Sequence, residues 1–309
     1  MVRSILAVLL VAIFAVGASA YDFLYTGDTA MTHDAGGFGV AGGLMYLMAD
    51  EYYDHDGEAQ ELGADWTAMW IPVHVYYSAM DNLEFGVNAK FGMLDLEVTE
   101  ESRQNETYEG SGLGDTWIWA KYMFLPDPMM SARVAFSMPT GNEPAGAAYF
   151  GSGFYGFDED EDIATGSGAM SIDGAVLFGV PAGPGQFDAA VGYRYHMARE
   201  ITEELREEIT YDYKCGNEIH FAAGYTYFLS DMMSLGLAAD GFFGSEGEVT
   251  VDDETETVDD SAANAVWINP SFMYMMENGV SLGIDMQYML MGQNVPVEWG
   301  FGAYVGWGM

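Results

Sequence analysis

The stretch VSLGIDMQYML, residues 280–290, alternates between two kinds of side chain. Its even-numbered positions, from Val280 to Leu290, are all apolar, whereas positions 281 to 287 on the odd series are Ser, Gly, Asp and Gln. Successive side chains of a β-strand point to opposite faces of a sheet. This stretch therefore predicts a strand with one apolar face and one polar face.

The same alternation recurs along the chain. Residues 83–93, 131–138, 187–196 and 297–309 repeat it, and their apolar positions contain no Lys, Arg, Asp or Glu. Less regular segments with the same tendency are 36–48, 64–77, 113–124, 166–179, 211–228, 233–243 and 263–276. The chain thus has about twelve predicted strands, many close to the roughly 9–11 residues with which a tilted strand crosses a bilayer.

The links between these segments alternate in length. Short, turn-like links at 78–82, 125–129, 181–185, 229–232 and 277–279 are separated by long ones at 49–63, 94–112, 139–165, 197–210 and 244–262. A soluble sandwich also alternates along its strands, but it has no reason to sort its links by length. Outer-membrane barrels do so, with short periplasmic turns and long outer loops. We therefore predict an all-β fold, a transmembrane antiparallel up-and-down β-barrel of about twelve strands over residues 36–309.

Charge follows the same division. The 309 residues contain 9 Lys plus Arg against 48 Asp plus Glu, a net charge of −39. Such a chain cannot neutralise phosphates, which excludes a nucleic-acid binder. Two thirds of the acidic residues fall on the long links, where carboxylates stay in water. One cysteine, Cys215, excludes an intramolecular disulfide and a cysteine-based zinc cluster.

The first twenty residues have the features of a secretory signal peptide. Arg3 precedes an apolar run from Ile5 to Val16, and Ala18-Ser19-Ala20 offers a cleavage site. We predict a cleaved signal peptide at 1–20, with an uncleaved anchor as the alternative, and an N-terminal periplasmic segment or plug at 21–35. An exported barrel of this kind would reach the cell outer membrane, with membrane lipid and the barrel-assembly machinery as partners.

The polar face of the strands would line the barrel interior. Its predicted lumen residues are Glu84, Lys90, Asp115, Trp117, Trp119, Lys121, Arg133, Asp173, Asp188, Arg194, His196, Lys214, Glu218, His220, Asp240 and Asp285. One interpretation is structural, because buried charges are usually paired. The other is functional, because charged side chains inside a pore screen solutes by charge and width. The two interpretations are compatible.

Aromatic and imidazole groups fall on the same face. Trp66, Trp70, Trp117 and Trp119 would give a pore flat surfaces for aromatic solutes, unless bulges move them into the interfacial aromatic girdle. Pro72 and Pro270 remove ladder donors and predict bulges or strand breaks. The inward His74, His196 and His220 are more simply read as solvated than as a metal site, so we expect no metal or other cofactor.

No sequence motif predicts an enzyme. The chain contains neither a Gly-x-Ser-x-Gly string nor a phosphate-binding Gly-x-x-x-x-Gly-Lys-Ser/Thr loop. The acidic runs 158–162 and 252–254 could collect divalent cations, although a solvated loop or adaptation to salt explains them as well.

Several short motifs resemble one family of outer-membrane transporters. They are an Asp- and Ala-rich start at 26–39, a hairpin over 80–87, Gly112-Leu113-Gly114-Asp115 before Ala120-Lys121-Tyr122, Pro139-Thr140-Gly141, and Gly192-Tyr193-Arg194-Tyr195. The family is named for the meta-pathway of phenol degradation. The resemblance implies an outer-membrane channel that passes aromatic or other hydrophobic small molecules.

Two functional hypotheses follow. The first is a passive channel for small hydrophobic or aromatic solutes, whose acidic outer loops repel anions and favour cations. The second is a non-transporting surface barrel whose acidic loops bind cations or partners while side chains fill the lumen.

Overall fold

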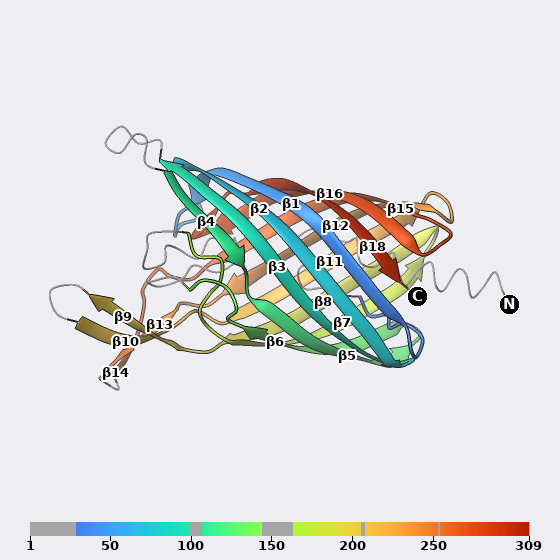
Figure 1. Ribbon diagram of the computed structural model, residues 1–309, viewed down its shortest axis with the longest axis horizontal. Helices are drawn as coiled ribbons and strands as arrows, with labels where there is room; N and C mark the ends of the chain where they lie inside the picture. Colours follow the sequence, from blue (N-terminus) through green and yellow to red (C-terminus); the bar gives the residue numbers. More distant parts are fainter. Residues whose placement is uncertain (1–28, 99–106, 144–162, 205–207, 253, 309) are drawn as a thin grey trace.

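The strands of the chain close into one barrel (Figure 1). The computed structural model describes residues 29–98, 107–143, 163–204, 208–252 and 254–308. The wall consists of β1 (Phe38–Tyr53), β2 (Ala59–Met80), β3 (Leu83–Val98), β4 (Thr107–Leu113), β5 (Thr116–Pro126), β6 (Met129–Met138), β7 (Ser171–Ala182), β8 (Gly185–His196), β11 (Glu218–Phe228), β12 (Met233–Gly244), β15 (Asn264–Met275), β16 (Val280–Gln293), β17 (Val295–Pro296) and β18 (Trp299–Gly308).

These segments fill twelve positions in the wall. β4 and β5 share one position because both pair with β3, and β17 continues β18 along β1. Every pairing is antiparallel, and β1 closes the ring by pairing with both β2 and β18, with Val40 opposite Val75 on one side and Trp307 on the other. The predicted transmembrane up-and-down barrel of about twelve strands is confirmed.

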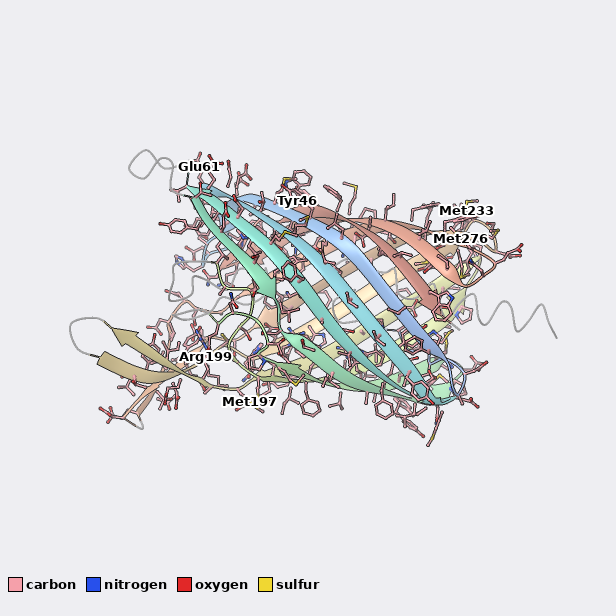
Figure 2. The ribbon with its side chains drawn as sticks, viewed as in Figure 1. Tyr46, Glu61, Met197, Arg199, Met233 and Met276 are labelled. Carbon is pink, nitrogen blue, oxygen red and sulfur yellow. The ribbon has the colours of Figure 1, made fainter. Side chains whose placement is uncertain are left out.

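The outer surface of the barrel is apolar. Along β16, Ile284, Met286 and Tyr288 are exposed, whereas Asp285 and Gln287 between them are buried. Figure 2 shows side chains such as those of Tyr46 and Met233 standing out from the wall. The wall is a single closed sheet, and no other described element covers its outer rows of apolar side chains. These rows form the surface that contacts lipid.

The two ends of the barrel differ. Short links at 81–82, 127–128, 183–184, 229–232 and 276–279 form one end, which we call the turn end. The described parts of the longer links, among them 197–204, 208–217 and 245–252, lie at the other end, which we call the loop end (Figure 1). The predicted long link 49–63 is mostly strand, because β1 and β2 continue to Tyr53 and from Ala59.

A second sheet projects from the loop end, where loops were predicted (Figure 1). It contains β9 (Arg199–Glu204), β10 (Glu208–Lys214), β13 (Glu248–Val251) and β14 (Glu254–Thr257), in the order β14-β13-β10-β9. The predicted strand 211–228 is therefore divided between β10 and β11. Ile201, Tyr213 and Cys215 are buried at the base of this sheet, and their burial raises the pKa of the Cys215 thiol.

The two prolines inside strands interrupt pairing without changing register. Pairing between β15 and β16 lapses between Ile268 and Ser271, around Pro270, and resumes in the same register. Pairing between β1 and β2 likewise lapses opposite Pro72. Of the predicted bulges or strand breaks, no bulge forms at either proline, and the ladder loses bonds there without gaining a residue.

In the part of the chain that the structure describes, no helix has the length and apolarity required to cross a membrane.

Candidate functional site

The barrel interior carries almost all of the predicted lumen residues. Fifteen of the sixteen lie on the inner side of the wall, buried or partly buried, and Trp66, Trp70 and His74 lie there as well. The exception is Lys214, which lies on β10 in the second sheet and pairs with Glu248 at 3.0 Å. The alternation of 211–228 predicts one strand, whereas the chain passes from the second sheet into the barrel wall between β10 and β11.

Glycines on the inner face allow aromatic rings to lie flat against the wall. A Cβ on Gly92 would fall 2.4 Å from the ring of Trp70, and one on Gly86 would fall 2.2 Å from Trp119. Rings covering glycines of a neighbouring strand pin the register of a sheet. Trp66, Trp70 and Trp119 therefore face the interior, which is the first of the two placements that the sequence left open.

Three basic side chains rest on these inward rings. The Lys90 ammonium lies 4.0 Å from the centre of the Trp70 ring, and Lys121 lies 5.7 Å from Trp119. The Arg194 guanidinium lies 5.0 Å from the ring of Trp117. Such cation–π contacts are worth more when the groups are shielded from water, as the buried Lys121 and Arg194 side chains are. The tryptophan faces are thus already occupied by the chain's own cations.

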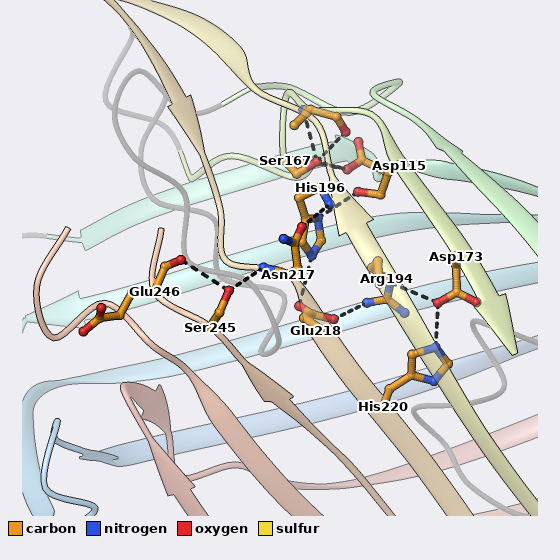
Figure 3. A network of polar contacts seen from close by, with 12 residues as sticks. Asp115, Ser167, Asp173, Arg194, His196, Asn217, Glu218, His220, Ser245 and Glu246 are labelled. Carbon is orange, nitrogen blue, oxygen red and sulfur yellow. Dashed lines mark hydrogen bonds and ion pairs between the residues drawn. The ribbon is translucent and has the colours of Figure 1, made fainter. Parts of the chain in front are cut away.

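One ionic network centres on Asp173 of β7 (Figure 3). Its carboxylate accepts a hydrogen bond from Arg133 at 2.9 Å and lies 3.5 Å from the Nε of Arg194 and 2.6 Å from the Nε2 of His220. Arg194 also pairs with Glu218 at 2.8 Å. Register brings these residues together, because Asp173 and Glu218 are both directly opposite Arg194 on the strands that flank β8.

The network ends at a serine–histidine pair. Ser171 Oγ and His196 Nδ1 are 2.8 Å apart, and His196 Nε2 lies 3.3 Å from Glu218. The order serine, histidine, acid is that of hydrolytic relays. Here, however, Ser171 is buried in the wall and Glu218 is bound to Arg194, so the three groups satisfy one another as part of the network.

A segment of the long link 139–170 folds into the loop end of the barrel. Ile163, Ala164 and Thr165 are fully buried, and Ile163 packs in the apolar cluster of Trp66 and Trp70. Ile163 N–H donates to the Glu109 carbonyl at 2.9 Å, and Thr165 Oγ1 donates to the Leu113 carbonyl at 2.6 Å. We call residues 163–169 the inner loop; it narrows the interior at the loop end.

Glycines on the inner face of β4 admit this inner loop. A Cβ on Gly110 would fall 2.0 Å from the backbone oxygen of Ile163, a separation that no side chain tolerates. Asp115 holds the far end of the segment, accepting bonds from Ser167 Oγ at 2.6 Å and Ser167 N–H at 2.9 Å. The Gly112-Leu113-Gly114-Asp115 motif thus serves to seat the inner loop.

Gly110→Val is expected to push the inner loop away from the wall and to raise single-channel conductance in planar bilayers. The matched control is Gly174→Val, because a Cβ at Gly174 meets nothing within 4 Å. An unchanged conductance in the folded Gly110→Val protein would show that residues 163–169 do not limit the pore.

Residues 29–35 occupy the turn end of the interior. Ala30 is fully buried and its carbonyl accepts a hydrogen bond from Ser131, while Thr32 Oγ1 donates to the Asp81 carbonyl at 2.6 Å. His33 Nδ1 lies 2.5 Å from Glu84, which also pairs with Lys121 at 2.9 Å. The interior is therefore narrowed at both ends by segments of the chain that are not wall strands.

Carboxyl groups outnumber basic groups on the described inner face of the barrel. The described inner face has eight carboxyl groups, those of the seven predicted acids Glu84, Asp115, Asp173, Asp188, Glu218, Asp240 and Asp285, and that of Glu298. Only Lys90, Lys121, Arg133 and Arg194 oppose them, and no Lys or Arg occurs in the sequence after Lys214. Among the described residues, no group of three or more His, Cys, Asp or Glu could hold a metal ion.

Several interior residues are missing from the sequence prediction, among them Glu298 and His33. Glu298 precedes Trp299, the first outward residue of the last strand, so the alternation itself assigns it to the inner face. It is buried and lies within electrostatic range of Lys90. The interior position of His33 could not be predicted from alternation, because residues 29–37 do not form a strand.

Comparison with known proteins agrees with this architecture. Residues 68–304 match the model of a family described as "Putative MetA-pathway of phenol degradation". Among solved structures, an outer membrane channel from Pseudomonas putida F1 matches with a TM-score of 0.69 at 14% identity, over 92% of this chain and 98% of that one. No curated protein sequence matches the chain.

Two further structures share the barrel more distantly. The beta domain of the Bordetella autotransporter Brka has a TM-score of 0.45 at 11% identity, over 89% of this chain and 100% of that one. The CymD monoaromatic hydrocarbon channel has a TM-score of 0.43 at 7% identity, over 95% and 97%. At these identities the P. putida channel establishes the fold, and the other two add nothing to it.

Proposed function

We propose that this chain, which belongs to the family described as "Putative MetA-pathway of phenol degradation", is a passive outer-membrane channel for small hydrophobic or aromatic solutes. The chain is an outer-membrane β-barrel and not an enzyme. The family match covers about three quarters of its length, and the P. putida relative of the same fold is itself an outer membrane channel.

The observation that carries the proposal is the composition of the interior. A barrel that served only as a surface scaffold could fill its lumen with apolar side chains. Here the inner face combines flat aromatic rings, such as Trp70 and Trp119, with eight carboxyl groups and four basic groups. The rings hold basic side chains against the wall, and the excess of carboxyl groups favours cations over anions.

Reconstitution into planar bilayers tests this function. We expect the mature protein to conduct ions and, under a KCl gradient, to give a reversal potential of the sign that cation selectivity produces. The physical reason is the negative potential of the lumen and of the acidic loop end, which concentrates cations. Silent bilayers or anion selectivity would contradict the proposal.

Uptake into liposomes addresses the class of solute. We expect phenol-sized aromatic solutes to enter loaded liposomes faster than small organic anions of similar size. Empty liposomes are the control, since hydrophobic solutes also cross lipid without a protein.

We further propose that residues 21–35 form a plug and that the turn end faces the periplasm. Short turns lie on the periplasmic side of outer-membrane barrels, and residues 29–35 are bonded inside that end. The predicted signal peptide, 1–20, lies outside the described residues and stays a prediction, as do the barrel-assembly machinery as a partner and a divalent-cation role for the run 158–162.

A second candidate function is favoured by the narrowing of both ends. A non-transporting surface barrel would keep the inner loop and residues 29–35 in place permanently. Its acidic second sheet, with Glu248, Glu254 and Glu256, would then bind cations or partners at the cell surface. Conductance of the plug-deleted chain, considered below, separates the two candidates.

A further inference from the structure

Tyr76 of β2 presents one ring face to the interior of the turn end. Its other face lies against the wall, because a Cβ on Gly39 of β1 would fall 2.2 Å from the ring. The ring is buried and fixed in place by the β1–β2 register, in which Gly39 is directly opposite Tyr76. Tyr76 is thus a rigid, flat aromatic platform.

The imidazole of His33 occupies this platform. The two rings are stacked, with centres 4.3 Å apart and planes 21° from parallel. Edge atoms of the imidazole make two polar contacts: Nε2 is 2.9 Å from the Tyr76 hydroxyl, and Nδ1 is 2.5 Å from Glu84 Oε2. His33 therefore makes every contact that a small planar ligand with a polar edge would make.

The Glu84 carboxylate, which accepts a hydrogen bond at this platform, is held in position by residues of the wall. Glu84 is buried, pairs with Lys121 at 2.9 Å and accepts a hydrogen bond from Ser78 at 3.1 Å. These contacts come from the wall itself, so the carboxylate keeps its position when His33 leaves. A ligand that donates one hydrogen bond from its ring edge would find a preorganised partner.

A cavity of about 30 Å³ adjoins the platform, and a ligand ring gains the remaining space by taking the place of the His33 imidazole. This cavity beside Tyr76 is lined by His74, Met273, Ser281 and Tyr304 among others. Its aromatic and thioether groups suit an apolar ring, because sulfur and ring edges contact aromatic faces favourably.

We propose that Tyr76, Glu84 and the adjoining cavity form a binding site for a small aromatic molecule with a hydrogen-bond donor on its ring, of the phenol type, and that His33 occupies this site as an intramolecular substitute. The solute and His33 exclude each other. A solute that reaches the turn end thereby displaces His33 and weakens the hold of residues 29–35 on the wall. The inference rests on the proposed function and names where in the channel an aromatic solute binds.

The test measures binding rather than transport. Mature protein in detergent micelles is titrated with phenol, and with cyclohexanol as a non-aromatic donor of similar size, using saturation-transfer NMR. His33→Ala should bind phenol roughly three- to tenfold more tightly than the unmodified chain, the range that one stacking pair is worth. Cyclohexanol, which can donate to Glu84 but cannot stack on Tyr76, should gain less than phenol.

Further variants distinguish the site from a general effect of mutation. In the His33→Ala background, Tyr76→Leu should abolish the gain, whereas Phe242→Leu, in a separate interior cluster, should preserve it. His33→Phe restores a ring on the platform and should return phenol affinity to the original level.

Either of two results would overturn the inference: equal phenol affinity in His33→Ala and unmodified protein, or an equal gain for cyclohexanol. Bilayer currents recorded on the same preparations separate this outcome from failure of the proposed function. A protein that conducts but shows no phenol site refutes the site alone, and a protein that binds phenol but never conducts refutes the channel.

Discussion

Deletion of residues 21–35 raises the single-channel conductance several-fold, if the turn end is closed by the plug. The contacts that hold residues 29–35 are those of Ala30, Thr32 and His33 with Ser131, Asp81 and Glu84 of the wall. Within the described residues the first wall strand begins at Phe38, so the deletion leaves the hydrogen bonds of the described wall strands intact. The measurement is a conductance histogram in planar bilayers, with heat-modifiable mobility on gels as the check that the barrel has folded.

A chain that begins at residue 29 is the matched control. It keeps each contact named above and should conduct like the full mature protein. Equal conductance in both truncated chains and the mature protein would place the restriction elsewhere and would favour the second candidate function, a barrel closed by its own side chains.

Asp173→Leu should produce the largest loss of stability. The change removes the Asp173 carboxylate from three buried or partly buried partners, Arg133, Arg194 and His220. Removing one partner of a buried ion pair leaves an uncompensated charge and costs about 3–5 kcal/mol. Urea unfolding of the refolded barrel, followed by tryptophan fluorescence, measures the loss.

Asp188→Asn is the control for this change. Asp188 is also an interior carboxyl group, but its hydrogen bonds come from the neutral amide of Gln186, at 2.8 Å and 3.0 Å. The amide of asparagine keeps one acceptor, and no buried cation is left behind. A stability loss in Asp173→Leu no greater than in Asp188→Asn would mean that the network around Asp173 is solvated rather than buried.

The barrel itself was predictable because a strand in a lipid-facing wall obeys one simple rule. Ile284 and Asp285 must face opposite sides, and so must Val134 and Arg133, so the sequence shows the inside and the outside directly. The same rule assigned Asp173, Arg194 and Glu218 to one face. It could not show that they meet, because contact depends on the register between β7, β8 and β11.

Alternation could not predict the segments that lie inside the barrel without being part of its wall. Ile163 and His33 belong to segments without periodicity, and only the completed barrel shows that glycines such as Gly110 leave room for one of them. Lys214 was misplaced for a related reason. The alternation of 211–228 continues from β10 into β11, although the chain enters the wall only after Cys215–Asn217. A period of two identifies a strand but does not identify the sheet to which it belongs.

The apolar side chains of the wall strands face lipid, and the polar side chains face an enclosed interior. Spin labels at single cysteines along 131–138 test this arrangement most directly, in a Cys215→Ser background that removes the native thiol. In lipid vesicles, labels at Ala132, Val134 and Phe136 should collide frequently with oxygen, and labels at Ser131, Ala135 and Ser137 should not, giving a period of two. Low oxygen accessibility at Val134 and Phe136, as two stacked sheets would produce, would contradict the account.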